Sequence, residues 1–215
     1  MTRAAATGSE QTVAGAPGAL LVIVSGPSGV GKDTVIASLC TIPTDPERYF
    51  VVTCTTRPRR EYEIDRVHYN FLSEAEFTRK RDGGGFLEAN LVHGHWYGTP
   101  RDEVRGALVA GRDAILKIDV QGAAAVKERV PDALLVFIVP PTLEALFQRL
   151  RSRATETADE LEIRQRNAAI ELARQGDYDQ VVVNETGEIA RTAAEIEAII
   201  EQEKRRNPDR RMRIT

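Results

Sequence analysis

ALLVIVSGPSGVGKDTVIASLC, residues 19–40, is the stretch of sequence from which the fold can be inferred. Residues 19–24 form a continuous apolar run rich in β-branched side chains, as expected of a buried strand. A glycine-rich loop follows at 26–31, after which the apolar residues recur at helical spacing. A strand, a glycine-rich loop and a helix in this order predict a binding site for the phosphates of a nucleotide.

The loop fits the Walker A pattern G-x-x-x-x-G-K, with Lys32 as its lysine. Because glycine tolerates positive φ angles, successive backbone N–H groups can turn towards phosphate oxygens at a helix N-terminus. Lys32 is then expected to span the β- and γ-phosphates of ATP. The alternative is a glycine-rich turn with an exposed lysine. The residues expected to contact ATP here are Gly26, Pro27, Ser28, Gly29, Val30, Gly31, Lys32, Asp33 and Thr34.

Position 33 departs from the Walker A pattern, which has Ser or Thr there to place a hydroxyl on magnesium. This chain has Asp33, followed by Thr34. A carboxylate is a good ligand for a hard cation, but it adds negative charge beside the phosphates. We therefore expect Asp33 to bind Mg²⁺, directly or through water. The alternative is that Asp33 only complements the positive end of the helix dipole.

Strand-like and helix-like segments alternate along the rest of the chain. Strands are predicted at 49–56, 113–120, 134–140 and 179–184, and helices at 73–82, 102–111 and 121–130. Continuous apolar strands that alternate with helices indicate a parallel sheet covered by helices on both faces. The predicted fold class is therefore α/β, with a P-loop core. Aromatic residues and glycines in HYNFL and FLEANLVHGHWYG predict short strands and loops, so this middle part is expected to be an insertion.

Length and composition limit the possible functions. A chain of 215 residues with 42% hydrophobic residues can bury one substantial core. A net charge of −3 gives no support for general binding to nucleic acid or anionic membranes. The longest apolar run is too short to cross a bilayer, so we expect a cytoplasmic protein. Cys40 and Cys54 lack metal-ligand spacing and are expected to be small buried residues.

Both ends of the sequence are predicted to be tails. Residues 1–18 are rich in Ala, Gly and Thr and are expected to be disordered. Residues 205–215 belong to a basic run that starts at Lys204. A solvated, frayed terminus is the favoured interpretation of this run, and an RNA-binding arm is the alternative.

Three arginines lie together in TCTTRPRR, residues 53–60, at the end of a predicted strand. Guanidinium groups in such a turn can clamp a phosphate from two directions, which would make a second phosphate site. Taken alone, however, an arginine-rich turn is more often a solvated loop.

The arginine turn and the phosphate loop make the sequence resemble the guanylate kinase family. Between Leu20 and Lys204, eight motifs occur in the family's order, namely GPSGVGKD, TTRPRR, HYNF, FLE, WYGT, IDVQG, RLRSR and VVVN. The resemblance implies transfer of a phosphoryl group from ATP to GMP with Mg²⁺, in purine nucleotide metabolism and GMP recycling. It divides a domain at 19–204 into core segments at 19–52, 100–148 and 167–204, a GMP-binding insertion at 53–99 and a lid at 149–166. It also makes dGMP a second expected acceptor and leaves the oligomeric state open.

Carried over by position, the resemblance also implies site residues. The GMP phosphate would be held by Arg57, Arg60, Tyr69 and Tyr97, and the base by Glu88, Thr53 and Thr99. A carboxylate such as Glu88 can accept hydrogen bonds from both N1–H and the 2-amino group of guanine. Adenine has an acceptor at N1, which would leave buried polar atoms unsatisfied. Asp119, at the end of a predicted strand, would serve magnesium, directly or through water, or the acceptor ribose.

The implied catalytic cations are Lys32, Arg57, Arg149, Arg153 and Arg166, while Asn184 is implied to contact adenine. Lys117 lies on the same strand face as Asp119, at a position where some family members carry another acid. An ion pair with Asp119 or a neighbouring acid is its plain interpretation. Two rival functions remain. One is a guanylate-kinase-like module that binds peptides without catalysis, and the other is a P-loop kinase with a different small acceptor.

Overall fold

The computed structural model describes residues 12–92, 94–151 and 158–214. Its central sheet has the strand order β10-β9-β2-β8-β3, and all neighbouring strands in it are parallel. The strands are β2 (Leu21–Ser25), β3 (Tyr49–Phe50), β8 (Ala114–Lys117), β9 (Leu134–Val139) and β10 (Gln180–Val183). The apolar runs of β2 and β9 are buried throughout, as expected for central strands of a parallel sheet. The predicted α/β fold is confirmed.

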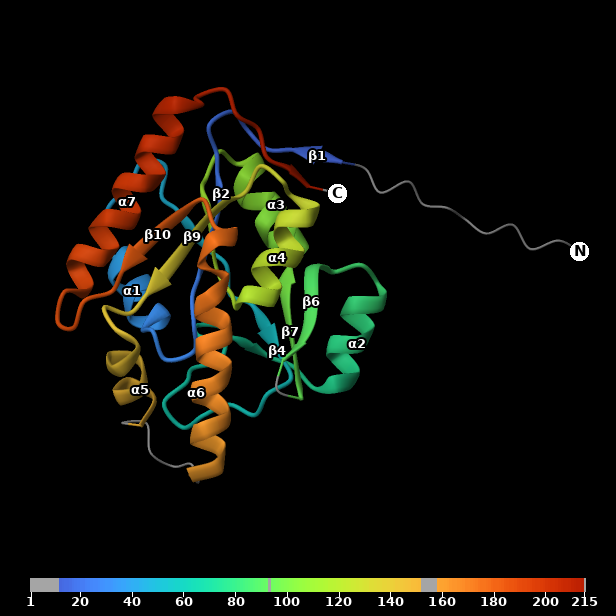
Figure 1. Ribbon diagram of the computed structural model, residues 1–215. Coiled ribbons are helices and arrows are strands. Elements are labelled where there is room, and N and C mark those ends of the chain that lie inside the picture. Colours follow the sequence, from blue (N-terminus) through green and yellow to red (C-terminus); the bar gives the residue numbers. More distant parts are fainter. Residues whose placement is uncertain (1–11, 93, 152–157, 215) are drawn as a thin grey trace, which may run out of the picture.

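Helices cover the central sheet on both sides (Figure 1). They are α1 (Lys32–Leu39), α3 (Arg101–Val109), α4 (Val120–Arg129), α5 (Leu143–Arg151), α6 (Ala158–Leu172) and α7 (Ile189–Arg206). Helices α1 and α7 pack against each other on one side, and α3 and α4 lie on the other. Connections between parallel strands are right-handed. A connection that moves one way along the sheet therefore places its helix on one face, and a connection that moves the other way places its helix on the opposite face.

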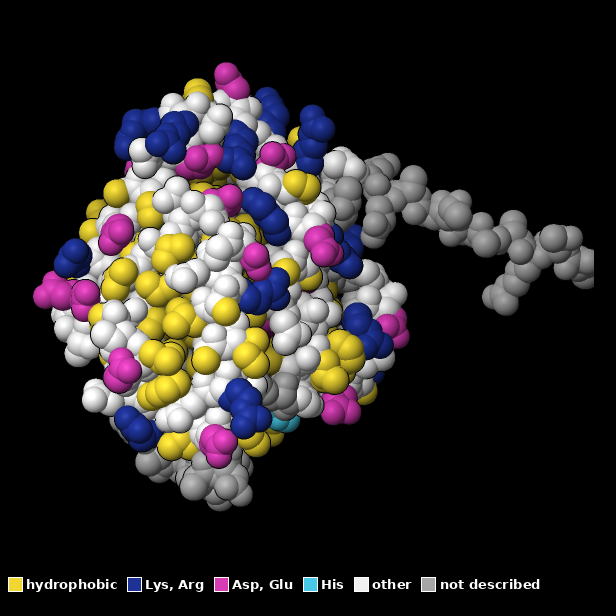
Figure 2. Space-filling view, in the orientation of Figure 1, with side chains coloured by type: hydrophobic (Ala, Val, Ile, Leu, Met, Phe, Trp, Pro, Cys, Tyr) yellow, Lys and Arg dark blue, Asp and Glu magenta, His cyan; other side chains and the backbone are white. Residues whose placement is uncertain are grey.

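The edge strand β10 is less covered than the sequence predicted. Val182 is fully buried, but Val181 and Val183 are each 43% exposed. Successive side chains of a strand point to opposite faces, so only the face of β10 that bears Val182, on the α7 side, is closed. Figure 2 shows hydrophobic side chains gathered over this part of the surface.

The predicted insertion forms its own small sheet, of strand order β5-β4-β7-β6. Its strands are β4 (Cys54–Thr55), β5 (Asn70–Phe71), β6 (Phe86–Val92) and β7 (His95–Pro100), and α2 (Glu74–Asp82) packs beside them. One expectation was wrong, because 49–56 is not a single strand. Tyr49 and Phe50 pair with β8, whereas Cys54 and Thr55 pair in the small sheet. An apolar run alone does not indicate where a chain changes sheets.

The two ends of the described chain are not loose tails. Strand β1 (Val13–Ala14) pairs antiparallel with β11 (Arg213–Ile214). Met212 is fully buried and Ile214 is 2% exposed, so the frayed terminus predicted at 205–215 is wrong for this segment. Because many side chains of this run are basic, the alternation of Met212 and Ile214 with polar residues, which is the pattern of a strand, was not recognised in the sequence. Residues 12–18 are likewise ordered, whereas 1–11 lie outside the described residues.

Two further observations concern the burial of the cysteines and the character of the helices. Cys54 is buried as expected, but Cys40, just after α1, is exposed. None of the helices in the described ranges combines the length and apolar character that crossing a membrane would require.

Candidate functional site

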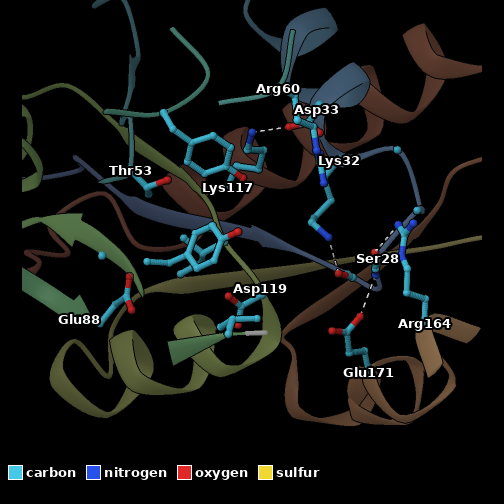
Figure 3. A pocket seen from close by; sticks show the side chains of 18 residues that line it. Ser28, Lys32, Asp33, Thr53, Arg60, Glu88, Lys117, Asp119, Arg164 and Glu171 are labelled. Atoms are coloured by element: carbon cyan, nitrogen blue, oxygen red, sulfur yellow. Dashed lines mark hydrogen bonds and ion pairs between the residues drawn. The ribbon is translucent and has the colours of Figure 1, made fainter. Parts of the chain in front are cut away.

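One cavity lies at the carboxyl ends of β2 and β8 and extends to the small sheet of the insertion. Its lining joins four parts of the chain that are distant in sequence, namely the phosphate loop, the insertion, the end of β8 and α6. The lining residues are Gly26, Ser28, Gly29, Gly31, Lys32, Asp33, Thr53, Arg60, Tyr69, Glu88, Val92, Tyr97, Gly98, Lys117, Ile118, Asp119, Arg164 and Glu171. Figure 3 shows Glu88 on one side of this cavity and the phosphate loop with Lys32 on the other.

The phosphate loop has the backbone conformation that its glycines allow. Gly26, Gly29 and Gly31 have φ angles of 150°, 84° and 100°. A Cβ atom at Gly26 would lie 2.4 Å from the carbonyl oxygen of Ile138, so no other residue fits there. Nζ of Lys32 folds back and donates to the carbonyl oxygens of Gly26 (2.6 Å) and Pro27 (3.2 Å). Burial lowers the pKa of Lys32, although nearby carboxylates, Glu171 first among them, oppose this shift.

Two side chains of α6 reach the phosphate loop. Oε2 of Glu171 accepts a 2.8 Å hydrogen bond from the backbone N–H of Ser28. Nη2 of Arg164 lies 3.5 Å from the hydroxyl oxygen of the same serine (Figure 3). A carboxylate therefore lies on a loop amide of the type that phosphate oxygens bind in such loops. Glu171 was not predicted as a site residue, and Arg164 lies within the predicted lid at 149–166 without a role implied by the resemblance.

The structure pairs the two unusual residues of the site with each other. Lys117, at the end of β8, donates through Nζ to the carboxylate of Asp33 in the first turn of α1. The same ammonium group lies 5.1 Å from the ring centroid of Tyr69. The ion pair that was the plain interpretation of Lys117 therefore exists, but its partner is Asp33 and not Asp119.

Glu88 is buried at the far end of the cavity, with 4% exposure. Its Oε1 accepts a 2.7 Å hydrogen bond from the hydroxyl group of Thr99, and its Oε2 accepts one of 2.7 Å from the side-chain amide of Asn90. Burial raises the pKa of Glu88 to about 7, and the two hydrogen bonds, which favour the charged form, offset this only in part. Each carboxylate oxygen can accept a further hydrogen bond. Asn90 was not identified from the sequence.

The arginine turn is organised by one buried acid, Glu63, which is 4% exposed. Its Oε1 accepts a 2.7 Å hydrogen bond from Nη2 of Arg57, and its Oε2 accepts from the backbone N–H of Arg60 (2.8 Å). Burial opposes the charge of Glu63, but these hydrogen bonds outweigh it and lower its pKa. Glu63 thus holds the turn in place, a role that the sequence analysis missed.

The predicted phosphate clamp is partly assembled at the cavity. Arg60 borders the cavity, and the rings of Tyr69 and Tyr97 meet edge to face with centroids 6.0 Å apart. The guanidinium group of Arg57 lies 5.6 Å from the ring centroid of Tyr69, but Arg57 itself is held by Glu63 and is not part of the lining. Thr53, predicted to contact the base, is buried and borders the cavity.

After Glu171, Asp33 and Asp119 are the carboxylates of the cavity lining whose charges act most on Lys32. Oδ1 of Asp119 caps α4 by accepting from the backbone N–H groups of Gln121 (2.8 Å) and Gly122 (3.1 Å). In the described ranges no group of three His, Cys, Asp or Glu side chains is arranged to hold a metal. Mg²⁺ is usually held by one or two carboxylates together with substrate phosphates and water, so this pair of oxygen donors fits it.

A second groove lies on the outer side of the phosphate loop, bordered among others by Thr34, Arg149 and Asn184. Arg149 donates to the carbonyl oxygens of Val30 (3.1 Å) and Asn184 (3.0 Å). The side-chain amide of Asn184 donates to the carbonyl oxygen of Val30 at 2.8 Å. Both side chains therefore brace the phosphate loop, and Asn184 does so through the amide group that was expected to meet adenine.

The lid arginines are placed differently from the prediction. The side chain of Arg166 is 71% exposed and pairs with Glu162 on the surface of α6, so the structure does not bring it to the cavity. Arg164, Ala168 and Glu171 share the inward face of α6, because residues four and seven positions apart align on a helix. Arg166 is two residues out of phase with this face. Arg153 lies outside the described residues.

Comparisons with known proteins agree with this geometry. The sequence model of the guanylate kinase family matches residues 19–203. The guanylate kinase of Symbiobacterium thermophilum is 46% identical over 191 residues, which cover 88% of each chain. That of Chelativorans sp. is 44% identical over 192 residues, which cover 89% of this chain and 86% of the relative. The crystal structure of guanylate kinase from Anaplasma phagocytophilum has a TM-score of 0.68 and 30% identity, with 86% of each chain covered.

Proposed function

Because the chain belongs to the guanylate kinase family and is an enzyme of that family, we propose that it transfers the γ-phosphoryl group of ATP to the phosphate of GMP. The products are ADP and GDP. The observation that supports this reaction best is the single cavity that runs from Lys32 to Glu88. A phosphoryl donor and a guanine base fit at opposite ends of such a space, with the reacting phosphates between them.

At the donor end, the phosphate loop cradles the β- and γ-phosphates with its backbone N–H groups. Lys32 leaves the carbonyl oxygens of Gly26 and Pro27 and turns its ammonium group towards these phosphates. Arg164, already next to Ser28, adds positive charge where negative charge spreads over the equatorial oxygens during transfer. We place the adenine base in the second groove, beside Arg149 and Asn184.

At the acceptor end, Glu88 accepts hydrogen bonds from N1–H and the 2-amino group of guanine. Thr99 and Asn90 hold its two oxygens in position for this. The GMP phosphate lies at Arg60, Tyr69 and Tyr97, with Arg57 supporting the clamp from behind. The phosphate of GMP is already anionic, so the reaction depends more on alignment of the acceptor oxygen than on a general base.

Asp33 and Asp119 would hold Mg²⁺, and the ion would neutralise charge on the β- and γ-phosphates of ATP. We further propose a cytoplasmic enzyme of purine nucleotide metabolism that recycles GMP and also accepts dGMP.

The test is ADP release from ATP and Mg²⁺ with GMP, dGMP, AMP, CMP or UMP as acceptor. Turnover is expected with GMP and dGMP, and Lys32→Ala should abolish it. Turnover with none of these acceptors would contradict the proposal and favour a binding module, while preference for another acceptor would favour a different P-loop kinase.

A further inference from the structure

Lys117 is a second cation at the base of the phosphate loop. Strands β2 and β8 pair in register with Val24 opposite Lys117, so Lys117 stands level with the strand end that leads into the loop. Its side chain is only 18% exposed, whereas that of its partner Asp33 is 63% exposed. The ammonium group is therefore held inside the cavity wall, and Asp33 meets it from the more open side.

The surroundings of Lys117 connect the two halves of the site. On one side is Asp33, next to Lys32 on α1. On the other side is the ring of Tyr69, 5.1 Å away, which in turn touches Tyr97. Figure 3 shows the side chain of Lys117 between the phosphate loop and the insertion, pointing at Asp33. An ammonium group here can reach phosphate oxygens that approach from the acceptor side.

The charges around Lys117 explain why it is paired with Asp33. Lys117 stands close enough to Lys32 to disfavour its charge, whereas the carboxylate of Asp33 favours it and also pairs directly with Lys117. When phosphates enter, their charge can take over this compensation, and the carboxylate is then repelled by them unless a cation binds it. The charge of bound phosphates thus favours separation of the ion pair between Lys117 and Asp33.

We propose that Lys117 is a ligand of the acceptor phosphate, kept in place by Asp33 until GMP arrives. The inference rests on the proposed function, since it assigns a residue to the GMP phosphate of that reaction. On binding, the ammonium group passes from the carboxylate of Asp33 to the phosphate. Asp33 is then available to the metal. The two residues that depart from the family's pattern, Asp33 and Lys117, therefore depend on each other.

The experiment measures binding of GMP and of guanosine by calorimetry, without ATP or Mg²⁺, so that it does not depend on turnover. Lys117→Met removes the charge at similar length, and Lys117→Arg keeps it. Lys80→Met, in α2 of the insertion, is the matched control. We expect Lys117→Met to weaken GMP binding about 10–100-fold, the usual effect of losing a charge-assisted hydrogen bond, and to leave guanosine binding unchanged. Lys117→Arg should retain most of the affinity.

Asp33→Ser provides the second half of the test. If Asp33 holds Lys117 back, this substitution frees the ammonium group and tightens GMP binding about 2–5-fold. The double variant should bind GMP as Lys117→Met does, because Asp33 acts through Lys117.

The outcomes separate the two proposals. Equal loss of GMP and guanosine affinity in Lys117→Met, or no loss of either, would overturn the role of Lys117. Failure of the wild-type protein to bind GMP at all would instead overturn the proposed function.

Discussion

Thr99 on β7 stands directly opposite Glu88 on β6, and its hydroxyl group donates a 2.7 Å hydrogen bond to Oε1 of that buried carboxylate. Cross-strand pairing thus sets the orientation of the group proposed to read the base. The two oxygens of Glu88 are aimed by Thr99 and Asn90, which leaves one acceptor position on each.

The first prediction concerns base selection by Glu88. In Glu88→Gln, an amide N–H₂ replaces one acceptor oxygen and opposes a guanine N–H donor. We expect kcat/KM for GMP to fall about 10–100-fold, corresponding to about 1–3 kcal/mol for one unsatisfied buried group. The preference for GMP over AMP should shrink by a similar factor. Steady-state kinetics with both acceptors measures this, and Glu74→Gln on the exposed side of α2 is the control. An unchanged GMP preference would remove Glu88 from base recognition.

The second prediction concerns pH. Only the charged carboxylate can accept both guanine hydrogen bonds, and burial raises the pKa of Glu88 to about 7. KM for GMP should therefore be constant above this pH and rise as the pH falls below it, by at most about tenfold per pH unit. The phosphate of GMP also titrates, near pH ~6. Glu88→Gln retains the phosphate titration and lacks the carboxyl group, so its weaker pH dependence is the diagnostic result. Identical pH profiles would contradict the prediction.

The third prediction separates two arginines of α6. Arg164 faces the phosphate loop, whereas Arg166 pairs with Glu162 at the surface. Arg164→Ala should lower kcat about 100-fold or more, the usual loss on removing a positioned charge from a transition state. Arg166→Ala should change kcat by less than about threefold, because exposed helical ion pairs contribute little. Single-turnover rates with saturating substrates measure both. A larger loss of kcat in Arg166→Ala than in Arg164→Ala would instead support the catalytic role that the resemblance implied for Arg166.

The fourth prediction concerns the contact between Glu171 and Ser28. The carboxylate accepts from a loop N–H that ATP is proposed to need, so it competes with the nucleotide. Glu171→Ala should tighten ATP binding about 2–10-fold, corresponding to one hydrogen bond of about 0.5–1.5 kcal/mol. Equilibrium titration with a non-hydrolysable ATP analogue measures this. Glu162→Ala, exposed on the same helix, is the control. Weaker ATP binding would show that Glu171 instead organises the loop for the nucleotide.

The fifth prediction concerns stability. Met212 is fully buried between the ends of the chain, so Met212→Ala should lower the free energy of unfolding by about 2–5 kcal/mol. Arg213→Ala, at the exposed next residue, which begins β11, should change it by less than about 0.5 kcal/mol. Urea unfolding of the two variants gives both values. Equal stability of the two would mean that this strand contributes little to the core.

Local patterns in the sequence predicted much of the fold. The apolar run of β2, the glycines of the loop and the spacing of α1 all lie within one short stretch. The insertion was predicted because its aromatic residues and glycines interrupt the alternation of strands and helices. These features depend on neighbours in sequence, which is why a single chain reveals them.

Contacts between distant segments could not be predicted in the same way. Glu171 meets Ser28 across 143 positions, and Lys117 meets Asp33 across 84, so no spacing rule connects either pair. The choice between Arg164 and Arg166 depends on the rotation of α6 about its axis. Its exposed Ile163 and Ile170 weaken the apolar periodicity that would have indicated this rotation.

The pairing of β1 with β11 also bears on how the protein is made. Val13 is among the earliest residues of the described chain to leave the ribosome, and its partner Ile214 is among the last. Strands β2, β8 and β9 can associate before synthesis reaches residue 212. Met212 and Ile214 can pack into the core only after they have been added. A chain that has not yet reached residue 214 therefore exposes apolar surface that Met212 and Ile214 later cover, and such surface favours aggregation.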